Sequence, residues 1–471
     1  MNNNLMDKIV ALCKRRGFIY PGSEIYGGLG GTWDWGPLGV EMKNNIKKIW
    51  WKDVVQLRED MVGIDSAIML NPKVWEASGH VAAFADFLVQ CRTCKGRFRI
   101  DELGLDKFYN PNTQILEFKS YEELGDINCP GGGHKFEFDL IGEDDAIGSG
   151  LKEVKIKPHK FNLLVPAYLG VLEDRKQLIY LRGEITQGVH INFKNVLDST
   201  RVKIPFGIAQ IGKAFRNEIT PGNFTFRSRE FEQMEIQYYI KPQEPEDKKW
   251  YEYWKNFWMD WYANSGIKKE NLRFKDHEEG QRAHYAKVAT DIEYQAPWGW
   301  AEFMGIHHRG DWDLSRHQQY SGQSMKYKDH ETGEEYTPFD IESSAGVDRS
   351  ALFFLIDAYS EENGRIILKL HPKIASYKVA VFPLLANKPE LVKVAHKIYQ
   401  DLKKDFMVAW DDRGNIGGRY ASQDEIGTPF CITVDFQSLE DEMVTVRDRD
   451  SAKQERVKIV DLTDYLHGKI E

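Results

Sequence analysis

The sequence predicts an α+β domain built on an antiparallel sheet, followed by a smaller α/β domain. One observation is the stretch of residues 208–240, which reads as a strand, a polar loop and a second strand. Another is the stretch of residues 339–359, in which a strand runs through a glycine turn into a helix. The third is the pattern beyond Leu370, where strands alternate with helices and end in a hairpin. That order is typical of a small α/β domain.

Size and composition indicate a globular chain that has room for several domains. It has 471 residues, of which 42% are hydrophobic and 13% aromatic, so a substantial core is available. The formal net charge is -9. A nucleic-acid partner would therefore have to meet local basic patches, because the molecule as a whole does not attract a polyanion.

The cysteine count and the hydropathy pattern bear on the compartment. Five cysteines are few and odd in number, which argues against a disulfide framework and for a reducing compartment. The first 18 residues lack the pattern of a signal peptide, and no apolar run is long enough to cross a bilayer. We expect a soluble, cytoplasmic protein that has no membrane partner.

A helix is expected over residues 38–51, directly after a glycine-rich segment. Pro37 suits the start of a helix. The glycines of residues 27–31 are not followed by Lys-Ser or Lys-Thr, so a P-loop is a poor interpretation. The helix has an apolar stripe, which predicts either packing in the core of the chain or a subunit interface. The stripe consists of Val40, Ile46, Ile49 and Trp50.

An insertion-like region of residues 88–160 carries a candidate metal site. Cys91 and Cys94 form a C-x-x-C pair, and Cys129 with His134 supplies two further ligands for a tetrahedral zinc ion. The alternative is a degraded knuckle that holds no metal. No open ligand position is implied, so any such zinc would be structural.

The first strand of the 208–240 stretch combines small and charged residues on one face. Side chains alternate between the faces of a strand. Arg216 and Glu218 therefore share a side with Gly212 and Ala214, which suits a floor for a flat ligand beside a cation. Arginines 227 and 229 follow the turn, and arginine is well suited to a bidentate grip on phosphate. The alternative is an ordinary hairpin with a solvated face.

The second strand of this stretch alternates more regularly. Met234, Ile236, Tyr238 and Ile240 point one way and predict a core face. Gln233, Glu235 and Gln237 point the other way. Buried polar residues are costly unless something pairs with them, so this face predicts a polar ligand.

Two further charged residues predict contacts with ions. Glu302 stands between apolar neighbours, so we expect it to be buried and to meet a cation. Arg349 falls in the first turn of the helix that follows Gly346, where a cation opposes the helix dipole. This position is favourable if an anion sits at the helix start.

Several of these stretches resemble the class II aminoacyl-tRNA synthetases, and in particular the glycyl enzymes. IGKAFRNEITP and FRSREFEQMEI resemble motif 2 of that family. The helix of residues 38–51 resembles motif 1, which packs across a two-fold axis, and residues 339–359 resemble motif 3, whose arginine contacts ATP. The part beyond residue 370 is similar to the anticodon-binding domain shared by several of these enzymes.

The resemblance implies a domain division and an activity. Residues 1–369 would form the class II catalytic domain, an antiparallel sheet flanked by helices and interrupted by the insertion, and residues 370–471 the anticodon-binding domain. The chain would activate glycine with ATP and Mg²⁺ to glycyl-adenylate and transfer it to the 3′ end of tRNA(Gly). It would form a homodimer through the region of residues 38–51. Two alternatives are a synthetase for serine, proline or threonine and a non-catalytic relative that binds nucleic acid.

The resemblance also implies site residues. The catalytic ones are Arg216, Glu302 and Arg349. ATP would contact Arg216, Asn217, Glu218, Phe226, Arg227, Ser228, Arg229, Glu230, Phe231, Glu302, Phe303, Gly346, Val347, Asp348 and Arg349. Glycine would contact Arg99, Glu184, Phe231, Glu232, Gln233, Met234, Glu235, Glu342, Ser343, Ser344, Ala345 and Gly346. Candidate RNA contacts are Arg413, Arg419, Arg447 and Arg449, for which a solvated surface is the alternative.

Two departures from the family pattern concern the glycine pocket. Gly183-Glu184-Ile185-Thr186 stands where the family usually has Pro-Glu-Thr-Ala, and Ser343 replaces a usual proline. Glu184 keeps its carboxylate, so by resemblance it binds the ammonium group of the amino acid together with Glu235 and Ser344.

Overall fold

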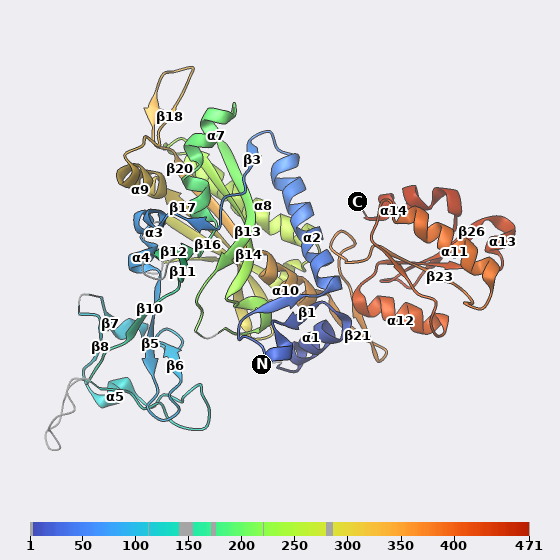
Figure 1. Ribbon diagram of the computed structural model, residues 1–471, viewed down its shortest axis with the longest axis horizontal. Helices are drawn as coiled ribbons and strands as arrows, with labels where there is room; N and C mark the ends of the chain where they lie inside the picture. Colours follow the sequence, from blue (N-terminus) through green and yellow to red (C-terminus); the bar gives the residue numbers. More distant parts are fainter. Residues whose placement is uncertain are drawn as a thin grey trace. The chain divides into compact units, whose positions relative to one another are not determined.

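The computed structural model describes residues 3–111, 113–140, 154–170, 176–219, 221–278 and 286–470. It divides into two compact units (Figure 1). The first comprises Met1–Ala67, Glu184–Lys213 and Asn223–Glu471, and the second comprises Ile68–Gly183 and Ala214–Gly222.

The first unit is organised around a seven-stranded sheet, ordered β15-β16-β17-β20-β14-β13-β3. Its strands are β15 (Leu272–Asp276), β16 (Val288–Ala296), β17 (Gly299–Gly310), β20 (Phe339–Gly346), β14 (Glu230–Ile240), β13 (Phe206–Phe215) and β3 (Met61–Gly63). The pairs from β15 to β14 are antiparallel, whereas β13 and β3 are parallel. The α+β class predicted from the sequence is confirmed.

One face of this sheet is covered by α2 (Pro37–Trp51), α8 (Glu246–Asn264) and α10 (Val347–Ala358) (Figure 1). Met234 and Ile236 of β14 point into the core beneath these helices. The alternating neighbours Gln233, Glu235 and Gln237 are also buried, but on the other side of the strand. That second face carries α6 (Thr186–His190) and α9 (Trp312–Ser321), so it is a polar layer enclosed by protein.

The apolar stripe of α2 packs within the chain. Ile46 and Trp50 are fully buried in the main core, and Ile49 packs against it. Val40 is 40% exposed. Ahead of α2 lie α1 (Asn3–Arg16) and a two-stranded sheet of β1 (Ile19–Pro21) and β2 (Trp33–Trp35). Between these strands, Ile25 and Tyr26 are each 87% exposed.

The second unit contains three small antiparallel sheets. They are β10-β5-β6 (His159–Asn162, Ala85–Gln90, Arg97–Arg99), β7-β8-β9 (Tyr109–Asn110, Ile115–Phe118, Val154–Ile156) and β11-β12-β4 (Val165–Leu169, Gln177–Leu181, Met69–Leu70). The short helices are α3 (Pro72–Ala77), α4 (His80–Ala83) and α5 (Tyr121–Leu124). This unit has an apolar cluster of its own, which includes Leu116, Phe118 and Ile156.

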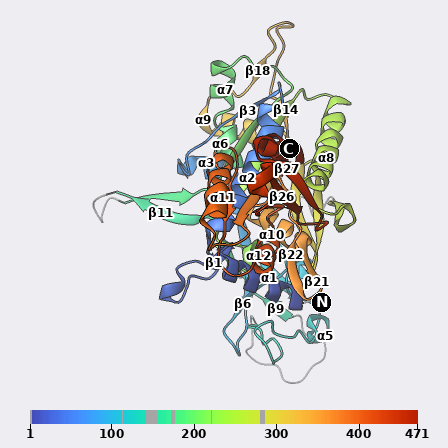
Figure 2. The same ribbon diagram turned by 90° about the vertical axis from the view of Figure 1, so that its right-hand side faces the viewer.

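The C-terminal part of the first unit has a separate five-stranded sheet, ordered β24-β23-β25-β26-β27 (Figure 2). Its strands are Val408–Trp410, Val379–Pro383, Phe430–Val434, Met443–Asp448 and Gln454–Lys458 in that order. The first three are parallel and the last two antiparallel, which matches the expected α/β pattern. The helices are α11 (Pro389–Leu402), α12 (Ile416–Ile426), α13 (Ser438–Asp441) and α14 (Leu462–Ile470).

The remaining elements are short connections. They are α7 (Phe193–Ser199), β18 (Tyr327–Lys328), β19 (Glu335–Tyr336), β21 (Tyr359–Glu362) and β22 (Arg365–Leu368). Within the described ranges, no helix combines the length and the apolar character that a membrane span requires.

Candidate active site

The enclosed face of the main sheet holds a cluster of buried acids around a single arginine. Glu235 lies on β14, Glu342 on β20 and Arg309 on β17, and all three are almost completely buried. Glu184 precedes α6 and Asp313 lies in α9, so two helices complete the cluster from above the sheet. Side-chain alternation places these groups on one face, because each strand directs the intervening residues into the core.

Arg309 neutralises part of this cluster. Its Nε and Nη2 donate to Asp313 at 2.7 and 3.0 Å, and Nη1 donates to Glu342 Oε2 at 3.0 Å. His307 Nδ1 lies 2.7 Å from Glu342 Oε1. Burial alone would raise the pKa of Glu342, but the charge of Arg309 and the contact with His307 outweigh it and bring the pKa down to about 2. Glu342 is therefore ionised.

The surroundings of Glu235, in contrast to those of Glu342, favour the neutral form of the carboxyl group. Burial, followed by the negative charges of Glu342 and Glu184, raises its pKa to about 8. Its neighbours are neutral donors. Gln237 Nε2 lies 2.6 Å from Glu235 Oε1 and 3.2 Å from Glu342 Oε2, and Thr186 Oγ1 contacts the same two carboxyl groups.

The cluster also contains acceptors that the described part of the chain leaves unused. Carboxylates accept hydrogen bonds, so the amide nitrogen of Gln237 must face them. Its oxygen, like that of Gln233, is buried and has no partner among the described residues. Unsatisfied buried acceptors beside a surplus of carboxylates suit a ligand that has several N–H donors and a positive charge, such as an ammonium group.

Glu184 is positioned by a hydrogen-bonded chain. Gln187 Nε2 donates to Glu184 Oε1 at 3.1 Å and to Asp313 Oδ1 at 2.9 Å. His317 Nε2 lies 2.8 Å from Gln187 Oε1. Gln187 and His317 were not among the residues predicted for the site. Arg309 and Asp313, four residues apart at the end of β17 and the start of α9, are the local sequence signal for this part of the site.

Arg349 and Glu302 bind each other. Arg349 Nη1 donates to Glu302 Oε1 at 2.8 Å and to the Glu302 carbonyl at 3.1 Å, and its guanidinium lies over the Phe226 ring at 4.4 Å. The expectation that Glu302 is buried is wrong, because its side chain is 53% exposed. A register shift in β16 opposite this position breaks the alternation that the prediction assumed. Burial and the charge of Glu302 raise the pKa of nearby Asp291.

Three predicted acids take part in a network with lysines. Lys43 Nζ lies 2.8 Å from Asp348 and 3.2 Å from Glu232, and the Glu232 amide donates to Asp348 at 2.6 Å. Lys47 bonds Glu232 at 3.0 Å, and Lys213 bonds Glu230 at 2.8 Å. This network ties β14 to α2 and to the start of α10.

The glycine-rich segment ahead of β2 holds Arg229. The Arg229 amide donates to Gly31 O at 2.7 Å, and Nη1 donates to Gly30 O at 2.9 Å. Six more of the predicted residues of this unit fall into two groups. Met234, Phe303, Ala345 and Val347 lie in the hydrophobic core, whereas Ser343 is buried in β20 and Ser344 Oγ accepts from Gln233 at 3.2 Å.

Four predicted residues belong to the second unit. Arg216 Nε donates to Gly183 O at 3.0 Å, and its guanidinium lies 5.2 Å from the centre of the Phe84 ring. The amide of Asn217 donates to Leu163 O at 2.8 Å, and Glu218 is buried. Arg99 bonds Asp101 at 2.7 Å and Asp86 at 3.1 Å.

The second unit also brings together the predicted metal ligands. One ligand atom from each of Cys91, Cys94, Cys129 and His134 lies within 4.8 Å of the others. The cysteines are free thiols, and His134 Nδ1 lies 2.7 Å from Gly132 O, which turns Nε2 toward Cys91 at 3.3 Å. Such an orienting bond to the outer nitrogen is usual for a metal-binding histidine. The donor set fits a tetrahedral zinc ion.

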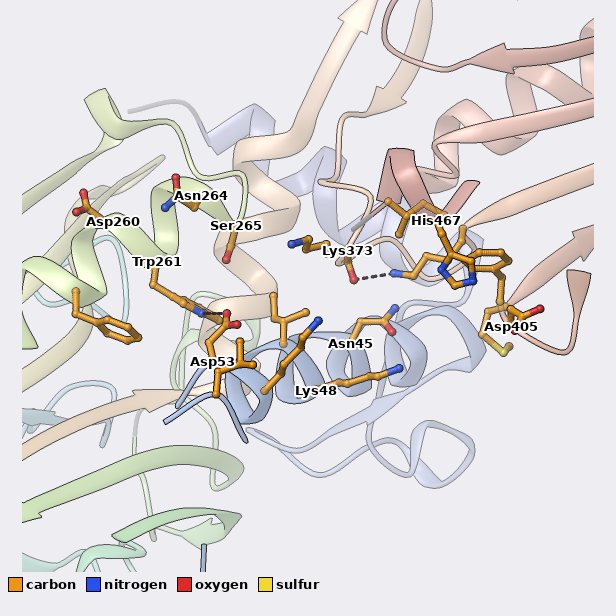
Figure 3. A pocket seen from close by; sticks show the side chains of 18 residues that line it. Asn45, Lys48, Asp53, Asp260, Trp261, Asn264, Ser265, Lys373, Asp405 and His467 are labelled. Atoms are coloured by element: carbon orange, nitrogen blue, oxygen red, sulfur yellow. Dashed lines mark hydrogen bonds between the residues drawn. The ribbon is translucent and has the colours of Figure 1, made fainter. Parts of the chain in front are cut away.

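A cavity of about 670 Å³ lies elsewhere in the first unit, beside α2 and α8 (Figure 3). Trp261 Nε1 donates to Asp53 at 2.9 Å along its wall. Lys378 Nζ donates to the carbonyls of Pro372, Lys373 and Ala375 at 2.9, 2.7 and 2.9 Å. None of the residues predicted for the site lines this cavity, and the acid cluster is on the other face of the sheet.

Three of the four candidate RNA-binding arginines are engaged within the protein. Arg419 donates to four backbone carbonyls, Arg449 to two carbonyls and Asp450, and Arg447 to Asp424 at 2.7 and 3.0 Å. The side chain of Arg413 is 92% exposed. Of this set, Arg413 is therefore the one whose side chain extends into solvent.

Comparison with known proteins gives two results. Residues 378–469 match the family described as an anticodon binding domain. The whole chain is similar to the glycine–tRNA ligase of Caldanaerobacter subterraneus subsp. tengcongensis, at 52% identity over 480 residues, covering 99% of this chain and 98% of the relative. The enzymes of Alkaliphilus oremlandii and Geobacillus kaustophilus are each 49% identical, over 99% of this chain and 98% and 99% of their own lengths.

Proposed function

This chain belongs to the glycine–tRNA ligase family, and from that premise we propose how its side chains activate glycine. In the first step the carboxylate of glycine attacks the α-phosphorus of ATP, which gives glycyl-adenylate and pyrophosphate. In the second step the terminal ribose of tRNA(Gly) takes the glycyl group as an ester and AMP leaves. The serine, proline and threonine alternatives and the non-catalytic alternative are not supported by these relatives.

The observation that carries the proposal is the acid cluster with its unused acceptors. Glycine brings an ammonium group, which must be compensated when it leaves water. Glu184 and Glu235 supply the charge, and the free oxygens of Gln233 and Gln237 supply further acceptors. Ser344 completes the ammonium pocket. Arg309 prevents the remaining acids from repelling one another.

The first step brings two anions together, so the protein must cancel charge and align the reactants. We assign Arg216 to the α-phosphate and the attacking carboxylate. Arg349 takes the β- and γ-phosphates together with Arg227 or Arg229. No general base is needed, because a carboxylate is already a nucleophile.

The adenosine and the magnesium ion of the ATP complex use further residues. Phe231 stacks on the adenine ring and Glu218 accepts from its amino group. Glu302 and Asp291 hold Mg²⁺, an assignment supported by the influence of Glu302 on the pKa of Asp291, since two neighbouring carboxylates favour a divalent cation. The ion neutralises phosphate charge when ATP is bound.

We also assign partners beyond the small substrates. The C-terminal domain binds the anticodon region of tRNA, with Arg413 as the exposed cation of the candidate set. A homodimer forms through the region of residues 38–51, supported by the exposed side chains of Val40, Ile25 and Tyr26 in and near it. We place the protein in the cytoplasm, in line with its few, unpaired cysteines.

We assign a structural zinc ion to Cys91, Cys94, Cys129 and His134. The ion would hold two loops of the second unit together and take no part in the reaction. Metal analysis of the purified protein should give about one zinc per chain, and Cys94→Ser should lower that content. A content far below one in the intact protein excludes the assignment.

The function is tested by pyrophosphate exchange with purified protein. We expect ATP–pyrophosphate exchange that depends on glycine and is absent with serine, proline, threonine or alanine. An exchange driven by another amino acid, with none from glycine, would refute the proposal. Sedimentation at micromolar concentration tests the dimer separately.

A further inference from the structure

Thr186 lies between two buried glutamates in a way that a single hydroxyl hydrogen cannot satisfy. Its Oγ1 is in close contact with Glu235 Oε1 and lies 3.1 Å from Glu342 Oε2. A hydroxyl has one hydrogen to donate. If both carboxyl groups were ionised, one of the two contacts would bring lone pairs together in a site that water does not reach. A second proton in the group removes this conflict.

Neighbouring groups decide which glutamate carries that proton. Glu342 accepts from Arg309 and His307 of β17, so its charged form is stabilised. Glu235 has no ion-pair partner in the described part of the chain. The groups that bond it are Thr186 of α6, Gln237 of its own strand and Ser344 of β20, all neutral.

The other charged groups around Glu235 also disfavour a negative charge on it. Glu184, at the start of α6, and Glu342, on β20, both disfavour a charge on Glu235. Asp313 of α9 is ionised, because Arg309 more than offsets the effect of burial on its pKa. Burial raises the pKa of Asp340, on β20, well above its usual value, which favours its neutral form. The cluster thus already holds more negative charge than Arg309 and His307 balance.

We propose that Glu235 carries a proton in the ligand-free site, and that the ammonium group of glycine binds by displacing this proton to solvent. Thr186 is the positioning residue, because it accepts from the Glu235 carboxyl group and donates to Glu342. The change balances: a neutral carboxyl and an ammonium become a carboxylate–ammonium pair and one released proton. This inference rests on the proposed binding of glycine at the acid cluster.

Calorimetry of the intact chain measures the proton directly. Glycine is titrated at pH 7.0 into protein in phosphate and in Tris, two buffers that differ in ionisation enthalpy. We expect about one proton released per glycine bound, falling toward zero by pH 8.5. In exchange assays, the KM for glycine should rise by up to tenfold for each unit that the pH is lowered below about 8, the pKa of Glu235.

Variants test the role of Thr186. For Thr186→Ala we expect the KM for glycine to rise about tenfold, the worth of one buried hydrogen bond, with kcat within about twofold. Thr186→Ser keeps the hydroxyl and should restore the wild-type KM. Thr433→Ala is the matched control, because it removes a buried hydroxyl that bonds Tyr420 in the C-terminal domain, and it should leave the KM unchanged.

The outcomes separate this inference from the proposed function. Glycine-dependent exchange without proton release would overturn the inference alone and indicate a hydroxyl shared between two ionised glutamates. An unchanged KM in Thr186→Ala would overturn the role of Thr186. Absence of exchange with glycine would overturn the function and the inference with it. The wild-type proton count decides the question even if a Thr186 variant fails to fold.

Discussion

Two buried arginines, Arg309 in the seven-stranded sheet and Arg419 in the C-terminal domain, have different surroundings. Both are almost inaccessible to solvent. Arg309 donates to the carboxylates of Asp313 and Glu342. Arg419 donates to the backbone carbonyls of Arg413, Pro383, Asp412 and Gly414 at 2.6 to 3.0 Å.

The two arginines differ in the charged groups and hydrogen-bond acceptors that remain around them once their own donors are paired. Around Arg309, further acids and two glutamine oxygens are left over, so the site still favours a cation. Around Arg419, the guanidinium donors meet backbone carbonyls of residues 412–414 and of Pro383 in β23, and among the described residues no carboxylate joins them. A buried arginine therefore indicates a ligand site when the charge around it is unbalanced, and a structural clamp when its donors are matched by backbone.

The largest effect should come from Arg309→Met. The change leaves Glu342 and Asp313 buried without their counter-ion, which costs roughly 3–5 kcal/mol of stability. We also expect glycine-dependent exchange to be lost. Denaturant unfolding and the exchange assay measure the two effects. A variant that keeps exchange within tenfold of the wild type would show that the acids are not the ammonium site.

Arg216→Ala should have the second-largest effect. Arg216 is only partly buried and bonds a carbonyl, so its loss should leave the fold intact. Removing one well-placed charge contact to a transition state costs roughly 3–4 kcal/mol, or 10²–10³ in rate. Pyrophosphate exchange measures this loss, with Arg413→Ala as the control, since that side chain is 92% exposed. Near-normal exchange in Arg216→Ala refutes its assignment to the α-phosphate.

Arg419→Met should destabilise without affecting activation of glycine. Four carbonyls lose their donor, and we expect the C-terminal domain to lose about 2–3 kcal/mol. Calorimetry should show this domain melting earlier, while exchange in the absence of tRNA stays at the wild-type rate. If exchange falls as it does in Arg309→Met, the distinction between clamp and ligand site is wrong.

The smallest predicted effect concerns the pH dependence of Glu235→Gln. The folded pKa of Glu235, about 8, lies above its ordinary value of 4.5, so the folded state holds a proton that the unfolded state releases between these values. Wild-type stability therefore falls as pH rises through this window, by up to about 1.4 kcal/mol for each pH unit. Glu235→Gln lacks this loss. The unfolding free energy of Glu235→Gln, relative to that of the wild type, should be higher at pH 8 than at pH 6. The same difference at both pH values would contradict the raised pKa.

Local patterns predicted the parts of the site that depend on one element. The alternation along β14 gave both its core face, with Met234 and Ile236, and its polar face, with Glu235, because strand geometry imposes a period of two. The position of Arg349 in the first turn of α10 followed from the glycine turn before it.

Other features depend on contacts across long stretches of sequence and could not be read locally. Lys43 bonds Asp348, 305 residues away, so the place of this acid in a lysine network has no local signal. The register shift that exposes Glu302 arises from pairing with β16. The carbonyls that bond Arg419 come partly from β23. The local sequence therefore predicted a surface arginine at a position that is buried in the structure.

The bonds of Arg229 to the glycine-rich segment have a thermodynamic consequence. Its Nη1 already donates to Gly30 O. A nucleotide that recruits this nitrogen replaces one acceptor by another, so only the difference between the two bonds contributes to affinity. If ATP takes Arg229 as proposed, ATP and the segment of residues 23–31 compete for one guanidinium. Occupancy of the nucleotide site and the conformation of that segment are linked, and each must shift the equilibrium of the other by the same factor.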